Sequence, residues 1–204
     1  MKLMRLGPAG QERPAVLVGD GLVGDGLVVD VSDAVADFDE AFFGSGGVGR
    51  LRALVSDRAG LGLAEPLGDR RIGAPIARPH QLLCIGLNYS DHAAETGQPV
   101  PAEPIVFNKA PNTLVGPNDT VLVPRGSTKT DWEVELGVVI GTKAQYVTLE
   151  RALDYVAGYC VVNDVSERQF QLERGSQWDK GKGCDTFGPI GPYLVTRDEI
   201  PDPQ

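Results

Sequence analysis

The sequence lacks the features that mark secreted and membrane-bound proteins. It holds only three cysteines, an odd number, two of them within apolar runs, so no disulfide framework is expected. No apolar run approaches the ~20 residues that a membrane-spanning helix needs. The N-terminal segment is interrupted by Arg5 and Gly7 and does not resemble a signal peptide. We therefore expect a cytoplasmic protein with no membrane partner.

Positive charge is scarce as well. The 204 residues include 28 Asp and Glu against 19 Lys and Arg, which gives a formal net charge of −9. Binding to nucleic acid requires a basic surface, so nucleic acid is not expected as a partner. A small anionic substrate remains compatible with this charge, because a bound cation can reverse the sign of the field locally.

Several catalytic signatures are missing too. The sequence has no Gly-x-Ser-x-Gly turn, no phosphate-binding P-loop and no dinucleotide fingerprint. Its cysteines lack a histidine neighbour of the kind that activates a thiol nucleophile. These absences argue against serine hydrolases, nucleotide-dependent enzymes and thiol enzymes.

The hydrophobic content of 42% is enough for a real core, and its patterning divides the chain in two. Residues 1–75 alternate short apolar runs with Gly-Asp-Gly turns, which predicts a small, β-rich N-terminal accessory domain. A proline-bearing stretch over 74–79 ends it. Residues 76–204 are the expected catalytic domain. Many strands with few, short helices favour an α+β fold that is mainly β.

The positions of the expected elements follow from apolar runs and turn residues. Strands are predicted at 81–85, 105–107, 121–123, 131–140 and 156–163. Helices are predicted at 48–59, at 91–96, from about 149 onward, and at 166–173.

One predicted strand carries two glutamates with strand spacing. Glu133 and Glu135 point to the same side of a strand, and Asp131 shares their register. The apolar residues that alternate with them, from Trp132 to Leu136, are expected to face a core. A solvated strand face is the simpler interpretation of such spacing. On a strand embedded in a core, however, carboxylates would be costly without a partner.

A third acid, Asp164, follows the apolar strand at 156–163. By itself it could be the cap of the helix that is predicted to begin near Ser166. Beside Glu133 and Glu135 it would complete a set of three oxygen ligands. Such a set suits Mg²⁺ or Mn²⁺ and does not suit zinc.

Three further sets of polar residues could contribute to catalysis or to substrate binding. His92 and Glu95 are three residues apart on one helical face, which fits either a catalytic base dyad or a surface ion pair. Lys182 lies in a glycine-punctuated basic loop, where it could neutralise a substrate carboxylate; a flexible surface loop is the alternative. Lys109 and Asn112 form a weaker polar cluster after a strand.

Taken together and in order, these segments resemble the fumarylacetoacetate hydrolase family. The matching pieces lie between residues 80 and 204 and are 85–89 with His92 and Glu95, 107–109 with 114–117, 132–136, 162–166 with Arg168, and 181–187. Within the family, segments 166–174 and 181–192 are similar to the hydrolases of 2,4-diketo-3-deoxy sugar acids such as the L-rhamnonate derivative. Gln169 and Cys184 stand where many relatives carry Asp and Phe.

The resemblance implies a mixed β-roll fold, a homodimer, and a lid that orders over the substrate. Family members continue with further strands beyond this end, so the C-terminal part of the roll is expected to be missing. The implied ligands of an Mg²⁺ or Mn²⁺ ion are Glu133, Glu135 and Asp164. The implied catalytic residues are His92, Glu95 and Lys182. The residues expected to contact the substrate are Tyr89, Lys109, Arg168 and Gln171.

The implied activity is hydrolysis of a C–C bond in a small 2,4-dioxo acid, a 2-oxo acid of the acylpyruvate type, to pyruvate and a second acid. Such a reaction would belong to carbohydrate acid catabolism if the substrate is a sugar acid. In this hypothesis His92, assisted by Glu95, activates the attacking water, and the ion acts with Lys182 as a Lewis acid. Oxaloacetate decarboxylation or hydroxydienoate isomerisation could use the same site. An inactive metal-binding module and an acidic interaction domain are the alternatives of another class.

Overall fold

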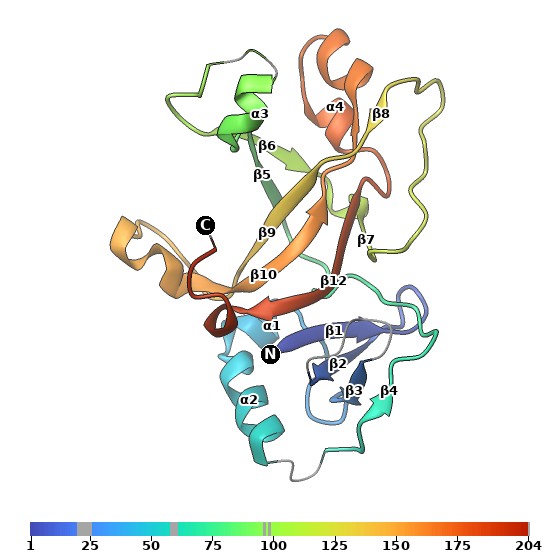
Figure 1. Cartoon of the computed structure of the whole chain (residues 1–204), viewed down its shortest axis with the longest axis vertical. Helices are drawn as coiled ribbons and strands as arrows, with labels where there is room; N and C mark the ends of the chain where they lie inside the picture. Colours follow the sequence, from blue (N-terminus) through green and yellow to red (C-terminus); the bar gives the residue numbers. More distant parts are fainter. Residues whose placement is uncertain (20–25, 58–60, 96, 98, 204) are drawn as a thin grey trace.

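The computed structural model describes residues 1–19, 26–57, 61–95, 97 and 99–203. Its largest element is an open eight-stranded sheet (Figure 1) in the order β4–β3–β2–β1–β12–β10–β9, with β7 paired to β12. Neighbouring strands are antiparallel except for β7 and β12. The strands are β1 (Lys2–Leu6), β2 (Arg13–Val18), β3 (Leu27–Asp30), β4 (Glu65–Pro66), β7 (Leu114–Val115), β9 (Val134–Ile140), β10 (Val156–Asn163) and β12 (Gly188–Thr196).

Strand β1 connects the two halves of this sheet. Lys2 pairs with Leu17 of β2 on one side and with Val195 of β12 on the other. The sheet therefore runs continuously from the N-terminal strands into the strands that carry the predicted acids. The division of the chain at residue 75 stays a prediction.

The main core lies on the face of the sheet that two helices cover, α1 (Glu40–Gly44) and α2 (Gly47–Asp57). Asp39 caps α1 by accepting a hydrogen bond from the backbone N–H of Phe42. The rings of Phe38 and Phe42 lie 5.0 Å apart within this core. Burying such a side chain contributes about 1.5–3 kcal/mol, so the aromatic contacts hold both helices against the sheet.

A separate two-stranded sheet carries the segment that was expected to form a lid. It consists of β5 (Leu82–Gly86) and β6 (Ile105–Lys109), and α3 (Ser90–Glu95) follows β5. Gly86 lies against Trp178, where a Cβ atom would come within 2.5 Å of the indole ring. Glycine is therefore required at this position for the hairpin to pack against the segment around Trp178.

Shorter elements complete the chain. Strands β8 and β11 pair with each other as a further two-stranded sheet. No helix in the described ranges is long and apolar enough to cross a membrane. The bounds are β8 (Thr130–Asp131), β11 (Ser166–Glu167), α4 (Asp179–Lys182), η1 (Pro111–Thr113), η2 (Leu149–Tyr155), η3 (Gln169–Glu173) and η4 (Arg197–Glu199).

The α+β fold class, mainly β, is confirmed. The strands predicted at 81–85 and 156–163 correspond to β5 and β10. The strand predicted at 121–123 is wrong. These residues form no ladder, and the backbone N–H of Leu122 donates instead to the hydroxyl of Thr186 (2.7 Å).

The single strand predicted at 131–140 is also wrong, because the chain changes partners within it. β8 ends at Asp131 and pairs with β11, whereas β9 begins at Val134 and pairs with β10. For the same reason the helix predicted at 166–173 begins as a strand, and only its second part forms a π-helical turn.

The apolar residues of the predicted glutamate strand do not face a core. Trp132 and Val134 are 71% and 68% exposed, and Leu136 is exposed as well. β9 is the edge strand of the large sheet. In the described part of the chain, the side of β9 that carries Val134 and Leu136 is exposed. The glutamates lie on the more buried side, which is the reverse of the expected arrangement.

Candidate active site

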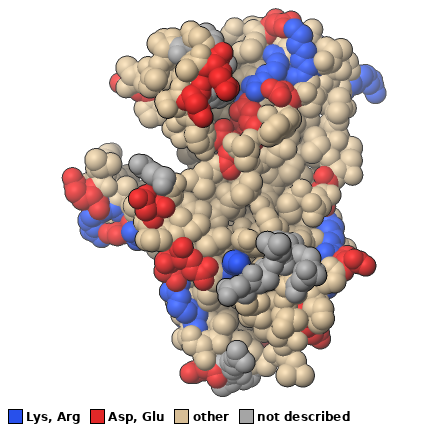
Figure 2. Space-filling model, viewed as in Figure 1, with Lys and Arg blue, Asp and Glu red and all other residues tan. Residues whose placement is uncertain are grey.

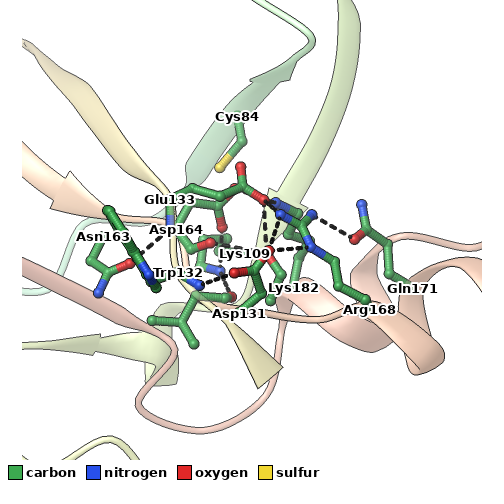
Figure 3. A network of polar contacts seen from close by, with 12 residues as sticks. Cys84, Lys109, Asp131, Trp132, Glu133, Asn163, Asp164, Arg168, Gln171 and Lys182 are labelled. Carbon is green, nitrogen blue, oxygen red and sulfur yellow. Dashed lines mark hydrogen bonds and ion pairs between the residues drawn. The ribbon is translucent and has the colours of Figure 1, made fainter. Parts of the chain in front are cut away.

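Strand register brings three acids from distant parts of the sequence together. Val162 of β10 pairs with Glu135 of β9. One step further, the backbone N–H of Asp164 donates to the carbonyl of Glu133 (2.9 Å). Asp164 therefore lies beside the segment that carries both glutamates, as Figure 3 shows for Glu133.

Two lysine side chains compensate these acids. The ammonium of Lys182 donates to Glu133 Oε1 (2.9 Å) and to Asp164 Oδ2 (2.6 Å). The ammonium of Lys109 donates to Asp164 Oδ1 (2.6 Å), and Ser166 donates to Glu133 Oε1 (3.1 Å). Lys182 thus bridges two of the predicted metal ligands, and Lys109 holds one of them from the other side.

These charges are removed from water. The side chains of Lys109, Lys182 and Asp164 are 1%, 3% and 6% exposed. Burial lowers the pKa of Lys109, and the adjacent Asp164 opposes that change. Burial raises the pKa of Glu135, and the charges of Glu133 and Asp164 add to the increase. Lys182 opposes this increase but does not cancel it.

Arg168 lies at the outer side of this cluster. It contacts Glu133 Oε1 (2.6 Å) and Asp131 Oδ2 (2.8 Å), and it donates to Gln171 Oε1 (3.2 Å). Burial by itself would lower the pKa of Arg168, but Glu133 and Asp131 outweigh this effect and raise it. The guanidinium is thus a fixed positive charge next to the acids.

A cleft of about 580 Å³ opens on this cluster. The residues that line it are Tyr89, Asp91, Glu95, Asp131, Trp132, Glu133, Val134, Glu135, Leu136 and Arg168. The hydroxyl of Tyr89 accepts a hydrogen bond from the backbone N–H of Leu136 (3.3 Å), so the α3 side contacts β9. Figure 2 shows acidic side chains gathered beside a hollow in the surface.

The predicted lid residues meet the acids only in part. Glu95 of α3 lines the cleft together with Glu133 and Glu135. His92 lies in α3, one helical turn before Glu95, but its side chain falls outside the described part of the structure. Its role with Glu95 stays a prediction.

The acids suit a hard metal ion by their chemistry. All three predicted ligands offer carboxylate oxygens, the donors that Mg²⁺ and Mn²⁺ prefer. Burial is the main cause of the raised pKa of Glu135, and the charges of Glu133 and Asp164 add to it. Among the described residues, no three Asp, Glu, His or Cys side chains are arranged as ligands of one ion. The ammonium of Lys182 lies between Glu133 and Asp164 instead. The chemistry of the donor atoms therefore fits the ion, while their arrangement is that of an ion-paired cluster around Lys182.

Two of the residues expected to contact the substrate lie behind the cleft. Lys109 and Gln171 are buried and are not part of its wall. Tyr89 and Arg168, in contrast, line it. The sequence analysis predicted that all four residues lie near the site, but it could not predict how deeply each side chain is buried.

A structural carboxylate, Glu167, was missed by the sequence reasoning. It is fully buried and accepts hydrogen bonds from Ser127 and from the backbone N–H groups of Lys129 (3.1 Å) and Gln169 (3.0 Å). It thereby ties the loop before β8 to the residues around Arg168. No local pattern could have revealed this role, because two of the donors lie about forty residues away.

Cys84 also lies close to the charged cluster (Figure 3). Burial, together with the charge of Asp164, raises the pKa of its thiol to about 11. A thiol with a pKa this far above neutrality is protonated at physiological pH.

Comparison with known proteins gives consistent results. Residues 81–204 match the family described as "Fumarylacetoacetate (FAA) hydrolase C-terminal". A curated protein of Burkholderia multivorans, named "Putative hydrolase", is 59% identical over 204 residues, covering all of this chain and 69% of its own length. A relative from Burkholderia ambifaria has the same identity and coverage.

Solved structures resemble the chain as well. A fumarylacetoacetate hydrolase from Exiguobacterium antarcticum is 31% identical with a TM-score of 0.71, over 97% of this chain and 67% of its own. A 5-carboxymethyl-2-hydroxymuconate delta-isomerase from Mycobacterium smegmatis is 30% identical with a TM-score of 0.70, over 96% of this chain and 66% of its own. The match in sequence and in structure, together with the acidic cleft, shows that the chain belongs to the fumarylacetoacetate hydrolase family.

Proposed function

We propose that the protein is a divalent-metal-dependent enzyme that hydrolyses a C–C bond in small 2,4-dioxo acids and releases pyruvate and a second acid. The observation that carries the proposal is the convergence of Glu133, which lines the cleft, and the buried Asp164 on one buried cation, Lys182. Glu135 lies close enough for its pKa to respond to both acids. We further propose that the protein acts as a homodimer in the cytoplasm.

In this proposal Glu133, Glu135 and Asp164 hold Mg²⁺ or Mn²⁺. The bound ion would supply Lewis-acid charge for the oxygens of a 2-oxo acid. Sugar-acid derivatives of the 2,4-diketo-3-deoxy type are the substrates that we propose to test first, because segments 166–174 and 181–192 resemble their hydrolases.

The chain's own residues would bind the anion and move the proton. Arg168 provides positive charge in the wall of the cleft, and Lys182 provides it behind the wall, where it is paired with Glu133. Glu95 lines the opposite wall, one helical turn from His92, and we propose that this pair removes a proton from the attacking water. Tyr89 bonds to the backbone of β9 and so keeps α3 close to the acids.

The proposal is tested by following pyruvate release from acetylpyruvate in the presence of Mg²⁺. The Glu135→Ala variant is expected to lose metal-dependent turnover, because it lacks a proposed ligand. Glu150→Gln, on a fully exposed glutamate far from the cleft, is the control and should retain it. Full activity of the wild-type protein in EDTA would refute metal dependence.

A second candidate is isomerisation of a hydroxydienoate at the same site. It is favoured by the names of two solved relatives, the Mycobacterium smegmatis isomerase and a 2-hydroxyhepta-2,4-diene-1,7-dioate isomerase from Mycobacterium marinum. Oxaloacetate decarboxylation would also need an enolate-like product to be stabilised. Product analysis with one substrate of each type distinguishes the three reactions, and metal binding without any turnover would indicate an inactive binding module.

A further inference from the structure

Two buried lysines share the carboxylate of Asp164, and they differ in what else they contact. Lys182 also donates to Glu133, which lies in the wall of the cleft. The second hydrogen bond of Lys109 goes to the backbone carbonyl of Val165 (3.0 Å), which is not a cleft residue. Figure 3 shows Lys109 in the middle of the charged cluster, next to Asp164. Among the described residues, Asp164 is the site acid to which Lys109 donates a hydrogen bond.

Lys109 is also the last residue of β6, so it joins the β5–β6 hairpin to the end of β10. Two other contacts lie at the same end of the hairpin. The backbone N–H of Asn108 donates to Asp179 Oδ1 (3.2 Å), and the rings of Phe107 and Trp178 lie 5.5 Å apart. The hairpin shares no ladder with the large sheet in the described ranges. Its position therefore depends on these side-chain contacts.

The hairpin determines where α3 lies. α3 begins four residues after β5, and it carries Glu95 on one wall of the cleft while the acids form the other. A shift of the hairpin relative to Asp164 would change the distance between Glu95 and Glu133. Misplacement of reacting groups by about 1 Å can cost on the order of 100-fold in rate.

We infer that Lys109 is a positioning residue, which fixes Asp164 and the hairpin that carries α3 and does not touch the substrate. This inference rests on the proposed metal-dependent function of the same site. Groups that orient metal ligands typically contribute about 10–100-fold to metal affinity or activity. Both partners of this ion pair are almost inaccessible to water, so removal of Lys109 would reduce the compensation of a buried carboxylate and disturb its position.

The Lys109→Met variant distinguishes a positioning role from a purely electrostatic role, because the two roles predict opposite changes in the affinity for a divalent cation. Methionine has a similar length but no charge, so Coulomb's law alone predicts tighter binding of a divalent cation. Positioning predicts weaker binding of Mn²⁺, by about 10–100-fold, in calorimetric titrations without substrate. For acetylpyruvate turnover it predicts a lower kcat with KM changed by no more than about threefold. Unchanged or tighter Mn²⁺ binding, or a raised KM with an unchanged kcat, would overturn the inference.

Amide hydrogen exchange on the metal-free protein tests the hairpin directly, whether or not the proposed reaction exists. We expect faster exchange in β5 and α3 of Lys109→Met, with β1, β2 and β12 unchanged. Lys143→Met, on an exposed lysine, is the matched control and should exchange like the wild type. If Lys109→Met does not fold, Lys109→Gln, which keeps one hydrogen-bond donor, replaces it. Wild-type exchange rates in β5 and α3 of the variant would refute the anchoring role, whereas wild-type protein that neither binds Mn²⁺ nor turns over substrate would refute the proposed function.

Discussion

Replacing Lys182 with methionine tests whether a buried ammonium holds the acids of the cleft together. The lysine side chain is 3% exposed and donates to both Glu133 (2.9 Å) and Asp164 (2.6 Å). Removing one partner from a buried ion pair costs about 3–5 kcal/mol, because the remaining charge loses its compensation. Lys109 and Arg168 still compensate the two acids here, so we expect the lower end, about 3 kcal/mol.

For a chain of this length, each kcal/mol shifts the Tm by about 2–4 °C, so the variant should melt about 6–12 °C lower. Thermal unfolding in metal-free buffer at pH 7.5, followed by circular dichroism, measures this shift. Lys180→Met is the matched control, since Lys180 lies on the same helix, is exposed, and donates only to the carbonyl of Arg174 among its described contacts. Its effect should stay within about 0.5 kcal/mol.

Thermal unfolding in the presence of Mn²⁺ is a second measurement on the same two variants. The ion should raise the Tm of Lys182→Met more than that of Lys180→Met, because a divalent charge replaces the missing ammonium. A Tm of Lys182→Met within about 2 °C of the control, with no additional effect of Mn²⁺, would refute the view that the acids depend on this cation.

The remaining predictions concern pH, packing and thiol chemistry. Burial and the charges of Glu133 and Asp164 raise the pKa of Glu135, so its contribution to stability is present below its unfolded pKa and is lost as the pH rises through the folded value. In metal-free urea titrations, Glu135→Gln should therefore be more stable than the wild type at pH 7, with a difference that shrinks toward pH 4; a constant difference would contradict this. Gly86→Ala places a Cβ atom 2.5 Å from the ring of Trp178 and should cost about 1–3 kcal/mol, whereas Gly44→Ala, with open space around it, serves as the control. Because the thiol pKa of Cys84 is raised to about 11, iodoacetamide at pH 7.5 should modify it far more slowly than an unfolded cysteine. Equal rates measured by peptide mapping would exclude a partly buried, neutral thiol.

Local sequence patterns determined much of the framework. The apolar runs at β5 and β10 and the turn residues around them gave two strands close to their observed bounds. The alternation of side chains placed Glu133 and Glu135 on one face, and the end of an apolar strand placed Asp164 near them. These inferences succeeded because strand periodicity and strand ends depend on neighbouring residues in the chain.

Only the tertiary structure decided how deeply the site residues are buried and which of them form ion pairs. The exchange of partners between β8 and β9 interrupted the predicted strand, and the open face of β9 left Trp132 in solvent. The two cations on Asp164 come from positions 55 and 18 residues away, and no local pattern distinguishes them from surface lysines. The sequence by itself indicated which acids could meet, because the alternation of side chains and the ends of strands depend on neighbouring residues in the chain. The folded chain decided which lysines neutralise them, because burial and ion pairing depend on segments that approach one another only after folding.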